Sequence, residues 1–109
     1  MSNVPVTAAA LITNQAGLHA RPCIKLTKLA KASPAEVEIS LTPEGPWVNA
    51  KSPVKVMRFR APAGASLYFR ASGENAQNVI DELLALVERK FDEDDEHEED
   101  EKAEEAGHA

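Results

Sequence analysis

The sequence predicts an α+β domain in which an antiparallel sheet carries its helices on one face. Short segments that alternate apolar and polar residues predict strands, and longer segments with apolar residues three and four positions apart predict amphipathic helices. These segments follow one another in the order β-α-β-β-α-β-α, which favours a sheet with helices on one side. The 109 residues suffice for one domain.

The first strand is predicted over residues 7–14, where Ala8, Ala10 and Ile12 share one face. A turn follows, in which Gly17 is free to adopt a positive φ.

The first helix is predicted over residues 20–32. Pro22 falls in its first turn, where a missing N–H costs nothing, and this places the helix start close to His19. The apolar stripe includes Leu26, Leu29 and Ala30.

The second strand is predicted over residues 36–41, with Val37, Ile39 and Leu41 pointing inward and Ser40 outward. A turn at 42–45 returns the chain for a short partner strand at 47–50. A short helix over 52–58 is predicted to begin with Ser52 as N-cap and Pro53 at its first position.

After a loop at 61–64, residues 66–71 alternate again, with Leu67, Phe69 and Ala71 inward. The last helix is predicted to begin with Asn75 as its cap. Its apolar stripe consists of Ile80, Leu83, Leu84, Val87 and Phe91.

Charge divides the chain into two parts. From Asp92 onward there are 11 of the 18 acidic residues and one of the 12 basic residues, and no large apolar side chain. We therefore expect a folded domain at 1–91 and a disordered acidic tail at 92–109. The remaining body has seven acidic and eleven basic residues, which suits an anionic ligand or an acidic partner but is too weak a charge for nucleic-acid binding.

The single cysteine, Cys23, cannot form an internal disulfide, which fits a cytoplasmic location. The N-terminus has no signal-peptide pattern, and no segment is apolar over the roughly 18 residues of a membrane span. His97 lies between carboxylates in a spacing that matches no defined metal site. We expect a monomer with no metal, no cofactor and no membrane insertion.

The segment Gly17-Leu18-His19-Ala20-Arg21-Pro22 carries the chemistry. Neutral imidazole is a good nitrogen nucleophile near neutral pH. A helix N-terminus offers N–H groups and partial positive charge to an anion, and the Arg21 guanidinium can chelate phosphate oxygens. These residues point to phosphoryl transfer through phosphohistidine. The plainer interpretation is that His19 and Arg21 are ordinary exposed polar residues.

The same segment resembles the active-site signature of the HPr family, the histidine-containing phosphocarriers of the phosphoenolpyruvate-dependent phosphotransferase system. Residues 49–57, Asn-Ala-Lys-Ser-Pro-Val-Lys-Val-Met, are similar to the family's second motif. The resemblance spans residues 6–91. It implies an open-faced β-sandwich with a four-stranded antiparallel sheet and three helices.

The resemblance implies that His19 is phosphorylated on Nδ1, with Gly17, Ala20 and Arg21 around the phosphate. The donor would be Enzyme I and the acceptor an EIIA-type protein. The carrier is then a substrate in both half-reactions and not an enzyme. Ala16 departs from the polar residue that many members carry, which predicts a tuned site.

Ser52 occupies the position of the family's regulatory serine, the target of an HPr kinase/phosphorylase in some bacteria. Pro53 departs from the usual bulky apolar residue there, and the alternative is that Ser52 is only an N-cap. By family position the partner-binding residues are Ala20, Ile24, Pro53, Val54 and Met57. Around them, Lys28, Lys31, Lys55 and Arg58 are candidates for steering an acidic partner.

Two questions stay open on the sequence alone. The carrier belongs either to the sugar-transport branch or to the nitrogen-regulatory branch. Residues 88–94 resemble the C-termini of several members of the nitrogen branch, the NPr subgroup. The rival from another functional class is a non-catalytic interaction module in which His19 is vestigial.

Overall fold

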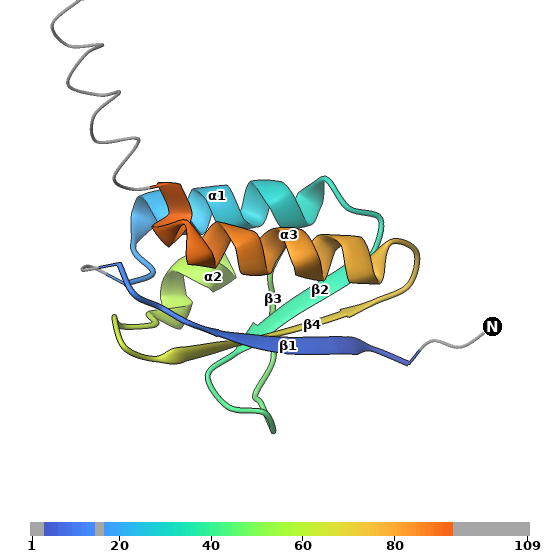
Figure 1. Cartoon of the computed structure of the whole chain (residues 1–109), viewed down its shortest axis with the longest axis horizontal. Coiled ribbons are helices and arrows are strands. Elements are labelled where there is room, and N and C mark those ends of the chain that lie inside the picture. Colours follow the sequence, from blue (N-terminus) through green and yellow to red (C-terminus); the bar gives the residue numbers. More distant parts are fainter. Residues whose placement is uncertain (1–3, 15–16, 93–109) are drawn as a thin grey trace, which may run out of the picture.

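The structure is a computed structural model that describes residues 4–14 and 17–92. One antiparallel sheet has the strand order β1-β4-β2-β3, and three helices cover one of its faces (Figure 1). The strands are β1 (Val6–Leu11), β2 (Glu36–Ser40), β3 (Val48–Asn49) and β4 (Ser66–Ser72). The helices are α1 (Ala20–Lys31), α2 (Pro53–Phe59), α3 (Ala76–Glu88) and the short 3-10 helix η1 (Lys90–Asp92). The predicted fold class is confirmed.

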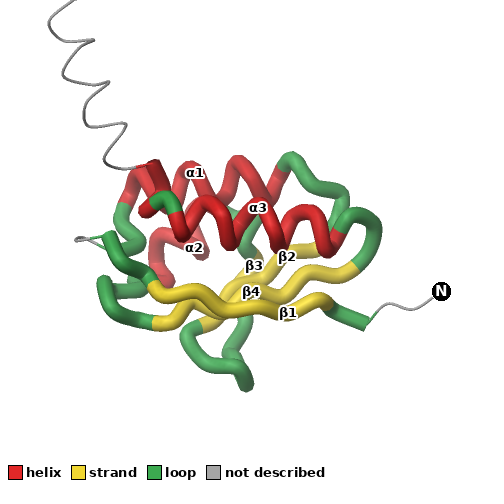
Figure 2. Tube along the Cα trace, viewed as in Figure 1, coloured by secondary structure: helices red, strands yellow, loops and turns green. Residues whose placement is uncertain are grey.

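The core lies between the sheet and the helix layer. Phe69 of β4 pairs with Ala8 of β1 on one side and with Ile39 of β2 on the other, so these three side chains share the face beneath the helices. Figure 2 shows this helix layer above the sheet, with the loop between β2 and β3 on the opposite side. The stripe predicted for α3 supplies the facing side, since Ile80 and Leu83 are buried.

The prediction for the end of β2 is wrong. Leu41, which was expected to point inward, is 39% exposed. Ser40 pairs with Tyr68 and so lies on the face opposite Ile39, as expected, but it is fully buried there. The strand ends at Ser40, whose Oγ accepts a hydrogen bond from the Thr42 N–H at 3.1 Å. Because the chain already turns at Leu41, the alternation of a strand no longer applies there.

The first strand is also shorter than predicted. β1 ends at Leu11, and Ile12 instead exchanges backbone hydrogen bonds with the loop before β4: its N–H donates to Ala65, and its carbonyl accepts from Gly64. Ile12 nevertheless keeps its predicted place in the core, with no exposed surface.

The two ends of α3 differ from the prediction. Asn75 is the N-cap residue, as predicted, but it has a left-handed φ of 65° and its side chain makes no capping hydrogen bond. The helix ends at Glu88, before Phe91, because Lys90, Phe91 and Asp92 all have left-handed backbone angles. This turn folds Phe91 back onto the core, where it is 1% exposed.

Ala16, His97 and the acidic segment after Asp92 lie outside the described residues. Over residues 4–14 and 17–92, no helix has both the length and the apolar character needed to cross a bilayer.

Candidate functional site

His19 is the N-cap residue of α1. Its backbone is extended, with φ −101° and ψ −161°, and its carbonyl accepts the first helical hydrogen bond, from the Cys23 N–H at 2.9 Å. The imidazole does not cap the helix, and the residue is exposed. The predicted nucleophile therefore stands at the helix start, on the surface.

The surroundings of His19 favour an anion. The first N–H groups of an α-helix have no acceptor within the helix, and Pro22 contributes none, so the amides of Ala20 and Arg21 lie at this end. The first turn contains no acidic residue, and the Arg21 side chain is exposed two positions from His19. The macrodipole and the guanidinium together would stabilise a bound phosphoryl group by about 1–3 kcal/mol.

The loop before His19 is held by the loop that precedes β4. The Leu18 N–H donates to the Ala61 carbonyl at 2.8 Å. Gly17 is buried with a φ of 70°, and a Cβ at this position would lie 2.6 Å from the Ala61 oxygen and 2.7 Å from the Ala63 nitrogen. The expected positive φ is confirmed, and the close approach gives a second reason for glycine.

Sequence reasoning missed Asn14 as a residue that supports the site. It is 3% exposed, and its Nδ2 donates to the Gly17 carbonyl at 2.7 Å. The Gly17 N–H in turn donates to the Asn14 carbonyl at 3.2 Å. The sequence pattern assigns Asn14 to a strand, and nothing in it predicts a hydrogen bond from the Asn14 side chain to Gly17.

Cys23 joins the start of α1 to α2. Its thiol contacts the carbonyl oxygens of Leu18 and Val56, each at 3.7 Å. The residue is 1% exposed, and burial raises the pKa of the Cys23 thiol. A protonated, enclosed thiol is a poor nucleophile, so Cys23 packs in the core as a small apolar residue.

The second motif forms α2, as predicted. The Ser52 hydroxyl accepts a hydrogen bond from the Lys55 N–H at 3.3 Å, and Pro53 occupies the first helical turn. Ser52 is half-buried, while Pro53 is exposed. Of the apolar residues that follow, Val56 is fully buried in the core.

Three large apolar side chains are exposed on the two helices next to His19. Ile24 of α1 is 50% exposed, and Val54 and Met57 of α2 are 58% and 44% exposed. The contact between Cys23 and Val56 places Ile24 and Met57 each one residue from the junction of the two helices. Ala20 and Pro53 are also exposed, so all five residues predicted to bind a partner are accessible on the surface.

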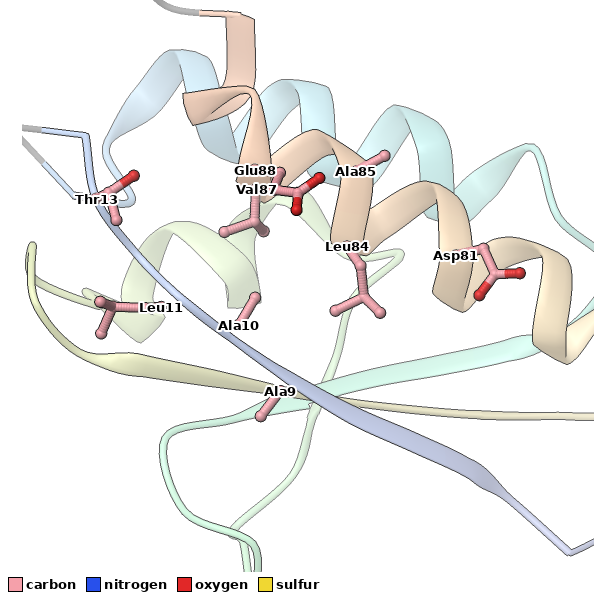
Figure 3. Close-up of a pocket in the computed structure, with 9 residues that line it drawn as sticks. All are labelled: Ala9, Ala10, Leu11, Thr13, Asp81, Leu84, Ala85, Val87 and Glu88. Carbon is pink, nitrogen blue, oxygen red and sulfur yellow. The ribbon is translucent and has the colours of Figure 1, made fainter.

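An open cavity of about 580 Å³ lies elsewhere, between the edge strand β1 and α3. Figure 3 shows Leu84 directed from α3 toward β1, with Asp81 and Glu88 along the helix. None of the predicted site residues lines this cavity. The candidate site is thus an exposed surface at a helix end, a form suited to transfer between proteins.

The comparisons with known proteins identify the family and match the fold. A family model described as the PTS HPr component phosphorylation site matches residues 6–89. The phosphocarrier protein HPr of Cupriavidus necator is 39% identical over 82 residues, which cover 75% of this chain and 90% of that protein. The phosphocarrier protein NPr of Escherichia coli K12 is 32% identical over 83 residues, covering 76% and 91%. The structure of HPr from Thermoanaerobacter tengcongensis matches with a TM-score of 0.72 at 28% identity, covering 79% of this chain and 94% of that one. The chain therefore belongs to the HPr family, the phosphocarrier proteins of the phosphotransferase system.

Proposed function

We propose that this phosphocarrier accepts a phosphoryl group from Enzyme I onto His19 in the cytoplasm and donates it to an EIIA-type acceptor. One observation carries the proposal: an exposed imidazole stands at the N-cap of α1, two residues from an arginine. Neither α1 nor α2 contains an acidic residue that would repel a phosphoryl group.

In the proposed first step, the Nδ1 lone pair of neutral His19 attacks phosphorus. The bond between phosphorus and the donor atom breaks, and its electron pair stays with that atom. Phosphorus thus exchanges one bond for another without the entry of water. Arg21 and the helix N-terminus stabilise charge on the moving oxygens, and the second step is the same exchange onto the acceptor.

The exposed apolar residues explain how a partner would be held during the transfer. Ile24, Val54 and Met57 present exposed apolar area on α1 and α2, and the charged residues of these two helices are all basic. Apolar anchors within a charged rim are typical of protein interfaces, and the charges accelerate encounter with an acidic partner.

The test is incubation of the protein with Enzyme I and phosphoenolpyruvate, followed by measurement of the intact mass. We expect a gain of one phosphoryl group that is lost in acid and absent in His19→Ala. Arg21→Ala, which keeps the imidazole, should label slowly but to completion. Equal labelling of His19→Ala and the wild type would refute the proposal.

We propose Ser52 as a second phosphorylation site, for an HPr kinase/phosphorylase that uses ATP. The observation in its favour is that the hydroxyl accepts the Lys55 backbone N–H at the N-cap of α2, so a phosphoryl group there would meet the positive end of a helix that has no acidic residue in its first turn. This modification should survive acid, require ATP and vanish in Ser52→Ala while persisting in His19→Ala.

The donor decides the branch of the phosphotransferase system. Relatives named HPr and NPr match nearly the same number of residues. Labelling rates with the Enzyme I of the sugar branch and with that of the nitrogen branch, compared at equal concentrations, would assign the carrier to the faster donor.

A further inference from the structure

Charge is segregated among the helices of this protein. α1 and α2 carry only basic charges, whereas α3 carries only acidic ones. We call the exposed residues Lys28, Lys31, Lys55 and Arg58 the cationic face. Within the part of the chain that the structure describes, no carboxylate forms an ion pair with any of these four.

The chain leaves the described domain at the edge of α1. Asp92 Oδ2 lies 3.5 Å from Lys25 Nζ, and Asp92 Oδ1 accepts a hydrogen bond from Arg89 Nε at 2.8 Å. Figure 1 shows the end of α3 beside the start of α1. The 17 residues that follow, 93–109, contain ten acidic residues and one basic residue. The most acidic segment is thus attached next to the most basic surface.

We propose that residues 93–109 lie across the cationic face and compete there with acidic partner proteins. The contact is autoinhibitory, because a partner must displace the tail before it reaches His19. This inference rests on the proposed function of His19, because the tail would compete with partners that must reach that residue.

The length of the tail is sufficient. Seventeen residues span at most about 60 Å when extended, and a helix of 12 residues such as α1 is about 18 Å long. A tethered segment of this length acts at a local concentration on the order of millimolar, so weak contacts are populated. α3 carries only acidic charges and repels the tail, so among the three α-helices α1 and α2 are the ones of complementary charge.

The attraction is between exposed charges and is therefore sensitive to salt. The screening length is about 10 Å at 0.1 M salt and about 3 Å at 1 M. We expect the tail to occupy the cationic face at low ionic strength and to leave it at high ionic strength. A contact held by apolar packing would not respond in this way.

A nitroxide on the tail tests the contact directly. Gly107→Cys provides the attachment point, and the buried native thiol of Cys23 should stay unlabelled, which intact mass verifies. Amide signals of isotope-labelled protein are recorded in low salt and in roughly 0.5 M salt. The matched control has the same length, with all ten tail carboxylates between Glu93 and Glu105 replaced by their amides.

We expect the nitroxide to broaden the amide signals of Lys28, Lys31, Lys55 and Arg58 at low salt and not those of the sheet residues 66–72. High salt and the amide tail should each remove the broadening. Broadening that is absent, uniform over the molecule, or unchanged in the amide-tail control would overturn the proposal. So would broadening between separate molecules in a mixture of isotope-labelled and nitroxide-labelled protein, because a second copy would then be the occupant.

The rate of phosphoryl labelling gives the functional consequence. At low salt the amide tail should raise the labelling rate of His19 by Enzyme I about two- to tenfold, and the difference should disappear at high salt. An equal rate for both tails at low salt would overturn the autoinhibitory role. Failure of the carrier function itself is distinguishable, because then neither tail variant is labelled while the nitroxide result stands.

Discussion

The Leu18 N–H donates to the carbonyl oxygen of Ala61 at 2.8 Å, so the residue just before His19 is held by a loop 43 positions further along the chain. The same carbonyl oxygen would lie 2.6 Å from a Cβ on Gly17. The two contacts fix the distance between the His19 loop and the loop before β4. The position of the imidazole at the start of α1 depends on this spacing.

Gly17→Ala should therefore destabilise the protein in two ways: alanine is strained at a positive φ, and its Cβ would overlap with the backbone oxygen of Ala61. Gly64→Ala is the matched control, because Gly64 also has a positive φ, of 89°, but a Cβ at that position would have no neighbour within 4 Å. We expect Gly64→Ala to lower the free energy of unfolding by about 1–2 kcal/mol. Gly17→Ala should lower it by about 1–3 kcal/mol more, since overpacking is added. Urea unfolding followed by Trp47 fluorescence measures both, and equal losses would contradict the role of the Ala61 contact.

Arg21 is expected to act on the transfer rate and not on folding. A hydrogen bond to a charged group contributes about 1.5–3 kcal/mol, so Arg21→Ala should slow phosphoryl transfer about ten- to a hundredfold. Arg21→Lys keeps the charge but loses the forked geometry of the guanidinium. Its transfer rate should therefore lie between that of the wild type and that of Arg21→Ala. Rapid-quench labelling with Enzyme I measures these rates. If lysine restored the full rate, charge alone would be sufficient and chelation by the guanidinium would be excluded.

Ser52 combines a structural role with a proposed regulatory one, and two variants separate them. Ser52→Ala removes the cap of α2 and should lower the free energy of unfolding by about 0.5–1 kcal/mol. Ser52→Asp keeps an acceptor at the N-cap and should retain most of the stability while adding negative charge. Thermal unfolding measures stability, and labelling by Enzyme I measures docking. A slower labelling rate in Ser52→Asp alone would support a charge switch; slowing in both variants would indicate the cap.

The Cys23 thiol should make the protein less stable in alkali. Burial raises the pKa of this thiol above its ordinary value, so the folded protein keeps the proton while the unfolded chain ionises. Its stabilising contribution is complete below the unfolded pKa and is lost as the pH rises through the folded pKa. The free energy of unfolding should thus fall more steeply above about pH 9 in the wild type than in Cys23→Ala. Parallel profiles for the two proteins would show that the thiol is accessible in the folded state.

The sequence predicted the parts of the fold that depend on local periodicity. The apolar stripe of α3, the alternation of β4 and the Ser52 cap need only neighbouring residues to be recognised, and all three are present. The errors occur where contacts distant in sequence decide the backbone. Leu41 is exposed because the chain turns after Ser40, and α3 stops before Phe91 because a left-handed turn packs that side chain in the core.

The candidate site divides in the same way. His19 and Arg21 are recognisable because their spacing lies within one short motif. The hydrogen bond from Asn14 to Gly17, the contacts of Cys23 and the fit of Gly17 against Ala61 are set by tertiary packing, and no local pattern marks them. The assignment of chemistry to His19 and of regulation to Ser52 stays a prediction.

The placement of His19 at one helix end has a kinetic consequence. If the donor and the acceptor both react with this ring, as proposed, they need the same surface and cannot be bound at the same time. Every delivered phosphoryl group then requires a departure and a new arrival. For such a carrier, fast dissociation from each partner raises the overall rate of phosphoryl transfer. Tighter binding to either partner would lower it.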